Sequence, residues 1–369
     1  MIPPDQIDGA PHPRDTAEVF GQDAAETAFL DAFSTGRLHH AGMLTGPKGI
    51  GKATLAWRMA RFLLATPDVQ DEGLFGAPPP PETLDIDPDH PVVHRIQAGA
   101  EPGLAAITRS LNDQGRLRGE IVVDDIRKLG KFFGLSSADG GRRVVIVDSA
   151  DEMNVSAANA LLKMLEEPPA RTTLLLVSHQ PSRLLPTIRS RCRSLRLGPL
   201  GADDMQAALS QTGTDLPNQT GYLAALAAGS VGDAVRLINL GGLEIYAELI
   251  AILGTLPRMD RQRALALAEA AAQRGAAERF ELLLTLIDVA LSRLAVTGAT
   301  GAPPVPEAAP NEGETLARLS ASPDHARRWA EVAATITARA RHGQAVNLDP
   351  AALVLDTVFK IQETAGQNR

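Results

Sequence analysis

The sequence predicts an α/β domain with a mainly parallel sheet over its first 200 residues, followed by an all-helical region. Residues 144–147 and 173–177 are uninterrupted apolar runs, which is typical of strands that helices cover on both faces. Helical patterns alternate with these short β-rich runs, as in a parallel α/β sheet. After residue 200 the strand signals stop and helical periodicity takes over. A chain of 369 residues is long enough for two or three domains of this kind.

The composition narrows the class of protein. Apolar residues make up 44% of the chain and aromatic residues only 4%, which favours helices packed through aliphatic side chains. The net charge of −8 argues against strong autonomous binding to nucleic acid. Cys192 is the only cysteine, so an internal disulfide and a cysteine zinc cage are excluded, and we expect no zinc. No run reaches the length of a membrane span and the start does not resemble a signal peptide, so we expect a cytoplasmic protein without membrane association.

The first elements surround a glycine-rich loop. An apolar segment near residues 43–44 leads into the loop, and a helix over residues 52–65 follows it. Residues 66–91 are rich in Pro, Asp and Gly and predict a loop. A further strand is expected over residues 193–197.

The remaining chain predicts a series of helices. Asp349 is a suitable N-cap for the last of them, with Pro350 at its first position. The segment 299–313 is rich in Pro, Ala and Gly and predicts a mobile loop. The expected helices cover residues 203–211, 222–227, 231–240, 243–256, 261–273, 277–296, 326–341 and 350–363.

The glycine-rich loop has the spacing of a P-loop, in which backbone N–H groups and a lysine hold phosphate oxygens. Its residues are Gly46, Pro47, Lys48, Gly49, Ile50, Gly51 and Lys52. Ala53 stands where Ser or Thr would hold Mg²⁺, and Thr54 lies about 100° further around the helix. The sequence therefore predicts a degenerate nucleotide site at which ATP is possible but not required. The alternative is a glycine-rich turn that opens an ordinary helix.

The strand at 144–147 delivers Asp148 to the same region, where it would orient Mg²⁺ through water. Active ATPases of this type carry a glutamate at the next position to polarise the attacking water, whereas this chain has Ser149. Asp151 and Glu152 follow beyond the end of the strand. The alternative role of Asp148 is to cap the turn that follows it.

These motifs resemble those of the clamp-loader subunits of bacterial DNA polymerase III, in the AAA+ superfamily, and most of all the delta-prime subunits. The resemblance is strong over residues 13–200. It implies an AAA+ P-loop domain (1–200), a small helical lid (201–242) and an all-helical collar for oligomerisation (243–369). The segments that carry it are residues 19–22, 46–52, 148–154, 159–169 and 184–192, with a lid motif at 229–234.

The departures from the family's ATPase subunits suggest which role this chain has. Besides Ala53 and Ser149, Gly232 stands where those subunits carry an arginine that senses nucleotide, and Ser178-His179 occupies the first sensor region. The resemblance implies a stator-like, delta-prime-like subunit without ATPase or polymerase activity of its own, within a DNA polymerase holoenzyme. It also implies a heteropentamer with ATPase subunits and a clamp-opening subunit, which loads the sliding clamp onto primer-template DNA.

The segment Ser190-Arg191-Cys192 implies an arginine finger in trans, because in the family this arginine reaches a neighbour's nucleotide. The alternative is a surface arginine paired with a carboxylate. Two other roles of the chain stay open. In the first, the chain is an active AAA+ motor, for a clamp loader or for branch migration. In the second, it is an interaction module whose P-loop and Arg191 have no function.

Overall fold

The computed structural model describes residues 3–66, 80–134, 141–214, 216–273, 275–346 and 348–367. The chain divides into two compact units. One comprises residues 1–214 with 229–233, and the other comprises residues 215–228 with 234–369. The short segment 229–233, from the predicted lid, thus belongs with the α/β unit. The predicted boundaries at 200–201 and 242–243 stay predictions.

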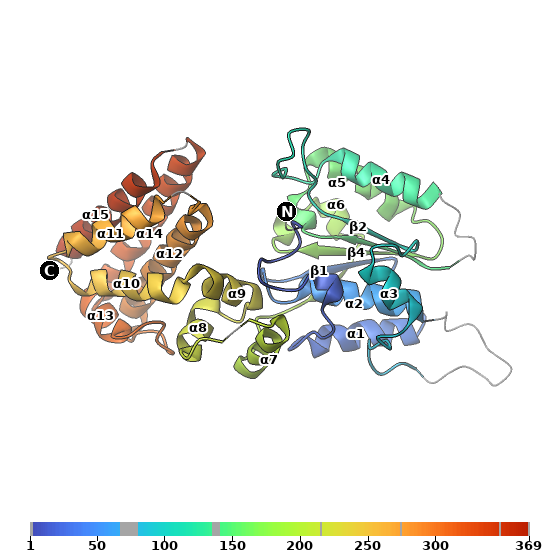
Figure 1. Ribbon diagram of the computed structural model, residues 1–369, viewed down its shortest axis with the longest axis horizontal. Coiled ribbons are helices and arrows are strands. Elements are labelled where there is room, and N and C mark those ends of the chain that lie inside the picture. Colours follow the sequence, from blue (N-terminus) through green and yellow to red (C-terminus); the bar gives the residue numbers. More distant parts are fainter. Residues whose placement is uncertain are drawn as a thin grey trace. The chain divides into compact units, whose positions relative to one another are not determined.

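The first unit is built on a five-stranded sheet in the order β2-β3-β4-β1-β5, and every pairing between neighbouring strands is parallel (Figure 1). Thr45 at the end of β1 is in register with Ser178 of β4 and Arg196 of β5, so the carboxyl ends of these strands lie at one edge of the sheet. The strands are β1 (Ala41–Thr45), β2 (Leu104–Ile107), β3 (Arg143–Val147), β4 (Thr172–Ser178) and β5 (Arg193–Arg196). The predicted α/β fold with a parallel sheet is confirmed.

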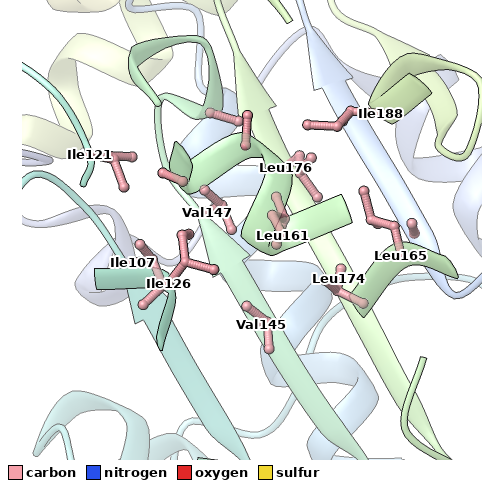
Figure 2. Close-up of a cluster of buried hydrophobic side chains, with 14 of the residues drawn as sticks. Ile107, Ile121, Ile126, Val145, Val147, Leu161, Leu165, Leu174, Leu176 and Ile188 are labelled. Carbon is pink, nitrogen blue, oxygen red and sulfur yellow. The ribbon is translucent and has the colours of Figure 1, made fainter. Parts of the chain in front are cut away.

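Helices cover both faces of this sheet (Figure 1). The face with α4, α5 and α6 contains a buried cluster in which Val145, Val147, Leu174 and Leu176 meet side chains from the helices (Figure 2). Because both faces are covered, all seven residues of β4 are buried, which explains its uninterrupted apolar run. The helices of this unit are α1 (Asp23–Ser34), α2 (Lys52–Ala65), α3 (Pro91–Gln97), α4 (Val123–Gly134), α5 (Val155–Glu166), α6 (Pro186–Arg189) and α7 (Ala202–Thr212), with short 3-10 helices at Pro13–Asp15, Ala150–Glu152 and Pro181–Arg183.

The second unit is helical throughout its described residues, as predicted. Its core surrounds α12, which contacts α10, α13 and α14, while α11 packs on α15. Trp329 of α14 is fully buried, and its Nε1 donates to the carbonyl of Leu319 at 3.1 Å. The helices that follow α7 are α8 (Thr220–Ala227), α9 (Val231–Leu240), α10 (Gly242–Gly254), α11 (Arg261–Ala271), α12 (Ala277–Thr300), α13 (Glu312–Leu319), α14 (Pro323–Ala345) and α15 (Pro350–Gln367).

The segment 299–313, predicted to be a mobile loop, is a loop over residues 301–311, and hydrogen bonds anchor it. Its first residues complete α12 and its last begin α13. Between them, the carbonyls of Pro304 and Pro306 accept hydrogen bonds from Arg293, and the backbone N–H of Ala308 donates to Glu312 at 2.6 Å. Glu312 is fully buried, so the loop is tied to a charged pair inside the helical unit. The predicted loop at 66–91 lies partly outside the described residues, and its last residue, Pro91, is the first residue of α3.

One described helix, α12, is long and apolar enough to cross a membrane by length and composition. Half of its most apolar window is buried within the chain. Its contacts with α10, α13 and α14 are those of a core helix.

Candidate functional site

The glycine-rich loop connects the end of β1 to the start of α2, the position at which a P-loop holds phosphate. Three of its glycines have positive φ: 145° at Gly46, 76° at Gly49 and 93° at Gly51. A Cβ atom at Gly46 would lie 2.4 Å from the carbonyl oxygen of Leu197, just beyond β5. Glycine is therefore needed at Gly46 both for its backbone conformation and for the close approach of the neighbouring chain.

Lys52 does not project into an open site. Its side chain is buried, and its Nζ donates to the carbonyl oxygens of Gly46, at 2.8 Å, and Pro47. Burial lowers the pKa of Lys52 to about 8, although Asp148 and Asp151 oppose this shift. The ammonium that would bind phosphate is thus engaged by the loop's own backbone.

The loop is also covered by residues from the lid motif. The N–H of Gly232 donates to the carbonyl of Gly49 at 3.0 Å. A Cβ at Gly49 would lie 2.3 Å from Ser230 Oγ, and a Cβ at Gly232 would lie 2.8 Å from the side chain of Ile7. Gly232, where the resemblance implies a nucleotide-sensing arginine in ATPase subunits, is thus a glycine packed directly on the loop. Both Lys52 Nζ and the Gly49 carbonyl are engaged within the chain.

Asp148 lies at the end of β3, as predicted, and is 9% exposed. Burial raises the pKa of its carboxyl to about 6, and the negative charge of Asp5 adds to the shift. Lys52 favours the ionised form but does not reverse the shift. The N-terminal segment thus places a second acidic group near Asp148, where a nucleotide site would place a metal ion and phosphates.

The residues after Asp148 are engaged in structural contacts. Ser149 has a left-handed backbone with φ of 57°, and its Oγ lies 3.2 Å from Nε2 of His179 in the first sensor region. Asp151 accepts the backbone N–H of His179 at 2.9 Å, and Glu152 forms an ion pair with Arg109 at 2.9 Å. Burial and then Lys52 lower the pKa of His179 to about 4, so it is neutral near pH 7. No carboxylate of this segment takes the place of the missing glutamate.

Gln22 connects three parts of the site in a way that the sequence did not reveal. Its side-chain amide donates to the carbonyls of Ile50, at 3.2 Å, and Gly198, at 2.9 Å, and its Oε1 accepts the N–H of Gly198 at 3.3 Å. The side chain is 5% exposed. Gln22 belongs to one of the segments that carry the resemblance, which was the available signal.

Arg191 follows α6, at the edge formed by α5 and α6. Its Nη2 forms an ion pair with Glu166 Oε1 at 2.9 Å, and its Nη1 donates to the carbonyl of Thr187 at 3.1 Å. The two charged side chains are 37% and 45% exposed. The predicted alternative, a surface arginine paired with a carboxylate, therefore describes its contacts within this chain.

Two further side chains have structural surroundings. Cys192 packs against the buried cluster of Figure 2, and burial raises the pKa of its thiol to about 11, which disfavours the reactive thiolate. Among the described residues no group of three or more His, Cys, Asp or Glu side chains is placed to hold a metal ion.

Comparison with known proteins finds a matching family model and several relatives. Residues 21–201 match a family model described as "DNA polymerase III, delta subunit". The chain is 38% identical over 215 residues to DNA polymerase III subunit delta' of Pseudomonas aeruginosa, covering 57% of this chain and 59% of that protein. It is 28% identical over 299 residues to DNA polymerase III subunit tau of Escherichia coli, covering 76% of this chain and 41% of that protein.

Among solved structures, the chain is similar to a DNA polymerase III gamma subunit-related protein of Thermotoga maritima, with 14% identity and a TM-score of 0.42, over 91% of this chain and 99% of that chain. The chain spans less than two thirds of the length of the delta' and tau relatives. The family match covers the part of the chain that contains the P-loop, Asp148 and Arg191. Residues 21–201 therefore match the family described as "DNA polymerase III, delta subunit", and the chain is similar to DNA polymerase III delta' subunits.

Proposed function

We propose that this chain is a stator-like, delta-prime-like subunit of a bacterial DNA polymerase III clamp loader. It helps to load the sliding clamp onto primed DNA and hydrolyses no ATP itself. The observation that carries the proposal is the closed phosphate loop, in which Lys52 binds its own backbone and Gly232 lies on Gly49. Ala53 and Ser149, in place of the Mg²⁺-binding hydroxyl and the glutamate, support the same role.

The chemical contribution that we propose for this chain is Arg191, acting in trans. A guanidinium is planar and permanently charged, so it stabilises the charge that builds on a transferring phosphoryl group. Arg191 is exposed enough to be reached by a neighbour, and it lies in the segment shared with the family. The ATP that it acts on is held by the adjoining ATPase subunit, and no step of the reaction passes through this chain's own P-loop.

The proposed partners are clamp-loader ATPase subunits and a clamp-opening subunit, joined as a heteropentamer through the helical unit. Sliding clamp and primer-template DNA are engaged by the complex in the cytoplasm. The net charge of −8 fits a subunit that does not hold DNA alone. We propose no zinc and no required nucleotide for this chain.

The alternative is an active AAA+ motor, and the similarity to a tau subunit is the observation that favours it. The two roles differ in one measurable respect, which is ATP hydrolysis by the isolated chain. We expect the isolated chain to show none above background. We also expect a reconstituted loader to place clamps on primed DNA far more slowly when this chain is omitted. If the isolated chain hydrolyses ATP and Lys52→Ala abolishes this activity, the chain is a motor. If clamp loading is unchanged when the chain is omitted, the chain is only an interaction module.

A further inference from the structure

Arg191 contacts its own subunit through the terminal nitrogens of its guanidinium, and a contact with phosphate would use at least one of these nitrogens. The two terminal nitrogens are both engaged within the chain, Nη2 by Glu166 Oε1 at 2.9 Å and Nη1 by the carbonyl of Thr187 at 3.1 Å. A bidentate contact to a phosphate uses two parallel N–H groups, and at least one of them comes from a terminal nitrogen. The arginine in this structure is therefore turned toward its own subunit.

The fold explains why the pair forms at this place. Glu166 is the last residue of α5, and Arg191 follows α6, which packs on α5. The carboxyl end of a helix carries a partial negative charge, which adds to the attraction for a cation. Glu167, the next residue, is also exposed but makes no ion pair with any of the described residues, so the contact is specific to Glu166.

We propose that Glu166 is an intramolecular latch: its carboxylate binds Arg191 within the same subunit until the phosphates of a neighbour's ATP compete for the arginine. This inference rests on the proposed function, because it assumes that Arg191 acts in trans. The latch makes the arginine respond to nucleotide on the neighbour. An ATP-bound neighbour draws the arginine across the interface, and an empty neighbour leaves it on Glu166. Glu166 is thus a positioning residue that acts through Arg191 and touches no substrate.

The strength of the contact suits a releasable latch. Both side chains are more than a third exposed, and an exposed ion pair shifts an equilibrium by only about 1.5- to 5-fold. An interaction of that size is readily outcompeted by a charged phosphate, whose hydrogen bonds to a guanidinium are among the stronger ones in proteins. A buried pair would instead hold the arginine permanently.

The test is Glu166→Gln in a fully reconstituted loader, with clamp- and DNA-stimulated ATP hydrolysis measured against ATP concentration. Glutamine keeps the shape and removes the charge, so we expect the ATP concentration at half-maximal rate to fall by about 1.5- to 5-fold. The maximal rate should stay unchanged, because the arginine that acts in the reaction is the same. Glu167→Gln is the matched control and should leave both quantities unchanged.

The same substitution in an Arg191→Ala background separates the latch from other causes. We expect Glu166→Gln to have no effect there, because nothing remains to be released. An equal shift in both backgrounds, an unchanged ATP dependence, or a lower maximal rate would each overturn the latch. If Arg191→Ala itself leaves hydrolysis unchanged, the arginine finger fails and the latch fails with it, which is a different result from a failure of the latch alone.

Discussion

Glu312 is the residue whose loss is expected to destabilise the helical unit most clearly. Its carboxylate is fully buried and accepts four hydrogen bonds: from Tyr246 Oη at 2.6 Å, from Arg293 Nε at 2.7 Å, from Arg293 Nη2 at 2.9 Å and from the Ala308 N–H at 2.6 Å. Burial and Glu312 together raise the pKa of Tyr246 above its usual range, so the phenol stays a hydrogen-bond donor. Glu312→Ala removes the common acceptor of all three partners.

The expected loss in free energy of unfolding depends on the charge that stays buried and unpaired after the substitution. Removing one partner of a buried ion pair costs about 3–5 kcal/mol, because the other charge stays buried. Arg293 keeps the carbonyls of Pro304 and Pro306 as acceptors, which places the expected loss near the lower end, at about 3 kcal/mol. For a unit of this size, that corresponds to a melting temperature lower by about 6–12 °C.

The two tryptophans allow each unit to be followed separately. Trp57 lies in the α/β unit and Trp329 in the helical unit, and both are buried. Trp57 Nε1 has no hydrogen-bond partner within the described chain, so Trp57→Phe loses no hydrogen bond there and leaves Trp329 as the fluorescent probe of the helical unit. In that background, urea unfolding should show the loss for Glu312→Ala. Exposed Glu314 is the control, and Glu314→Ala should change the free energy of unfolding by less than about 0.5 kcal/mol. A loss below about 1 kcal/mol for Glu312→Ala would refute the reasoning.

Three further predictions concern the phosphate loop. Asp148→Asn should stabilise the α/β unit at pH 7 by on the order of 3 kcal/mol, because the pKa of Asp148 is raised to about 6 in the folded chain. The wild-type protein loses this stability as the pH rises from about 4 to 6, where Asp148 becomes charged. In thermal melts the gain from the substitution should therefore vanish below about pH 4. Gly49→Ala should lower the melting temperature of that unit, since its Cβ meets Ser230, whereas Gly198→Ala, in open space, should not. Gln22→Ala should cost about 1–3 kcal/mol in urea unfolding through unpaired backbone groups at Ile50 and Gly198, and a cost near zero would contradict this.

The features that were predicted correctly depend on local sequence. The apolar runs of β3 and β4 and the periodicity of α8 to α12 are properties of adjacent residues, and the sequence placed them within a few positions. The strand β2 (Leu104–Ile107) was not predicted. It is only four residues long, and two of them are alanines, which are depleted in strands, so it has neither the length nor the β-branched content that identifies a buried strand.

The features that were missed depend on contacts between distant parts of the chain. Gly49 and Gly232 lie far apart in sequence, and the hydrogen bond that closes the loop follows from the fold alone. The hydrogen bonds that anchor the segment 299–313 were not predicted, because its composition is that of a loop, whereas Arg293 and Glu312 form a buried pair. The position of Arg191 was indicated by its segment, but its contact with Glu166 was not.

The central claim is tested most directly by Arg191→Ala in the reconstituted loader, with Arg189→Ala, a neighbouring exposed arginine, as the control. ATP hydrolysis stimulated by clamp and primed DNA is the measurement. We expect hydrolysis at the adjoining ATPase site to fall by about 10³-fold or more, the range known for arginine fingers, while Arg189→Ala leaves the rate unchanged. Equal rates for wild type and Arg191→Ala would contradict the account, because the chain would then contribute no group to its neighbour's reaction.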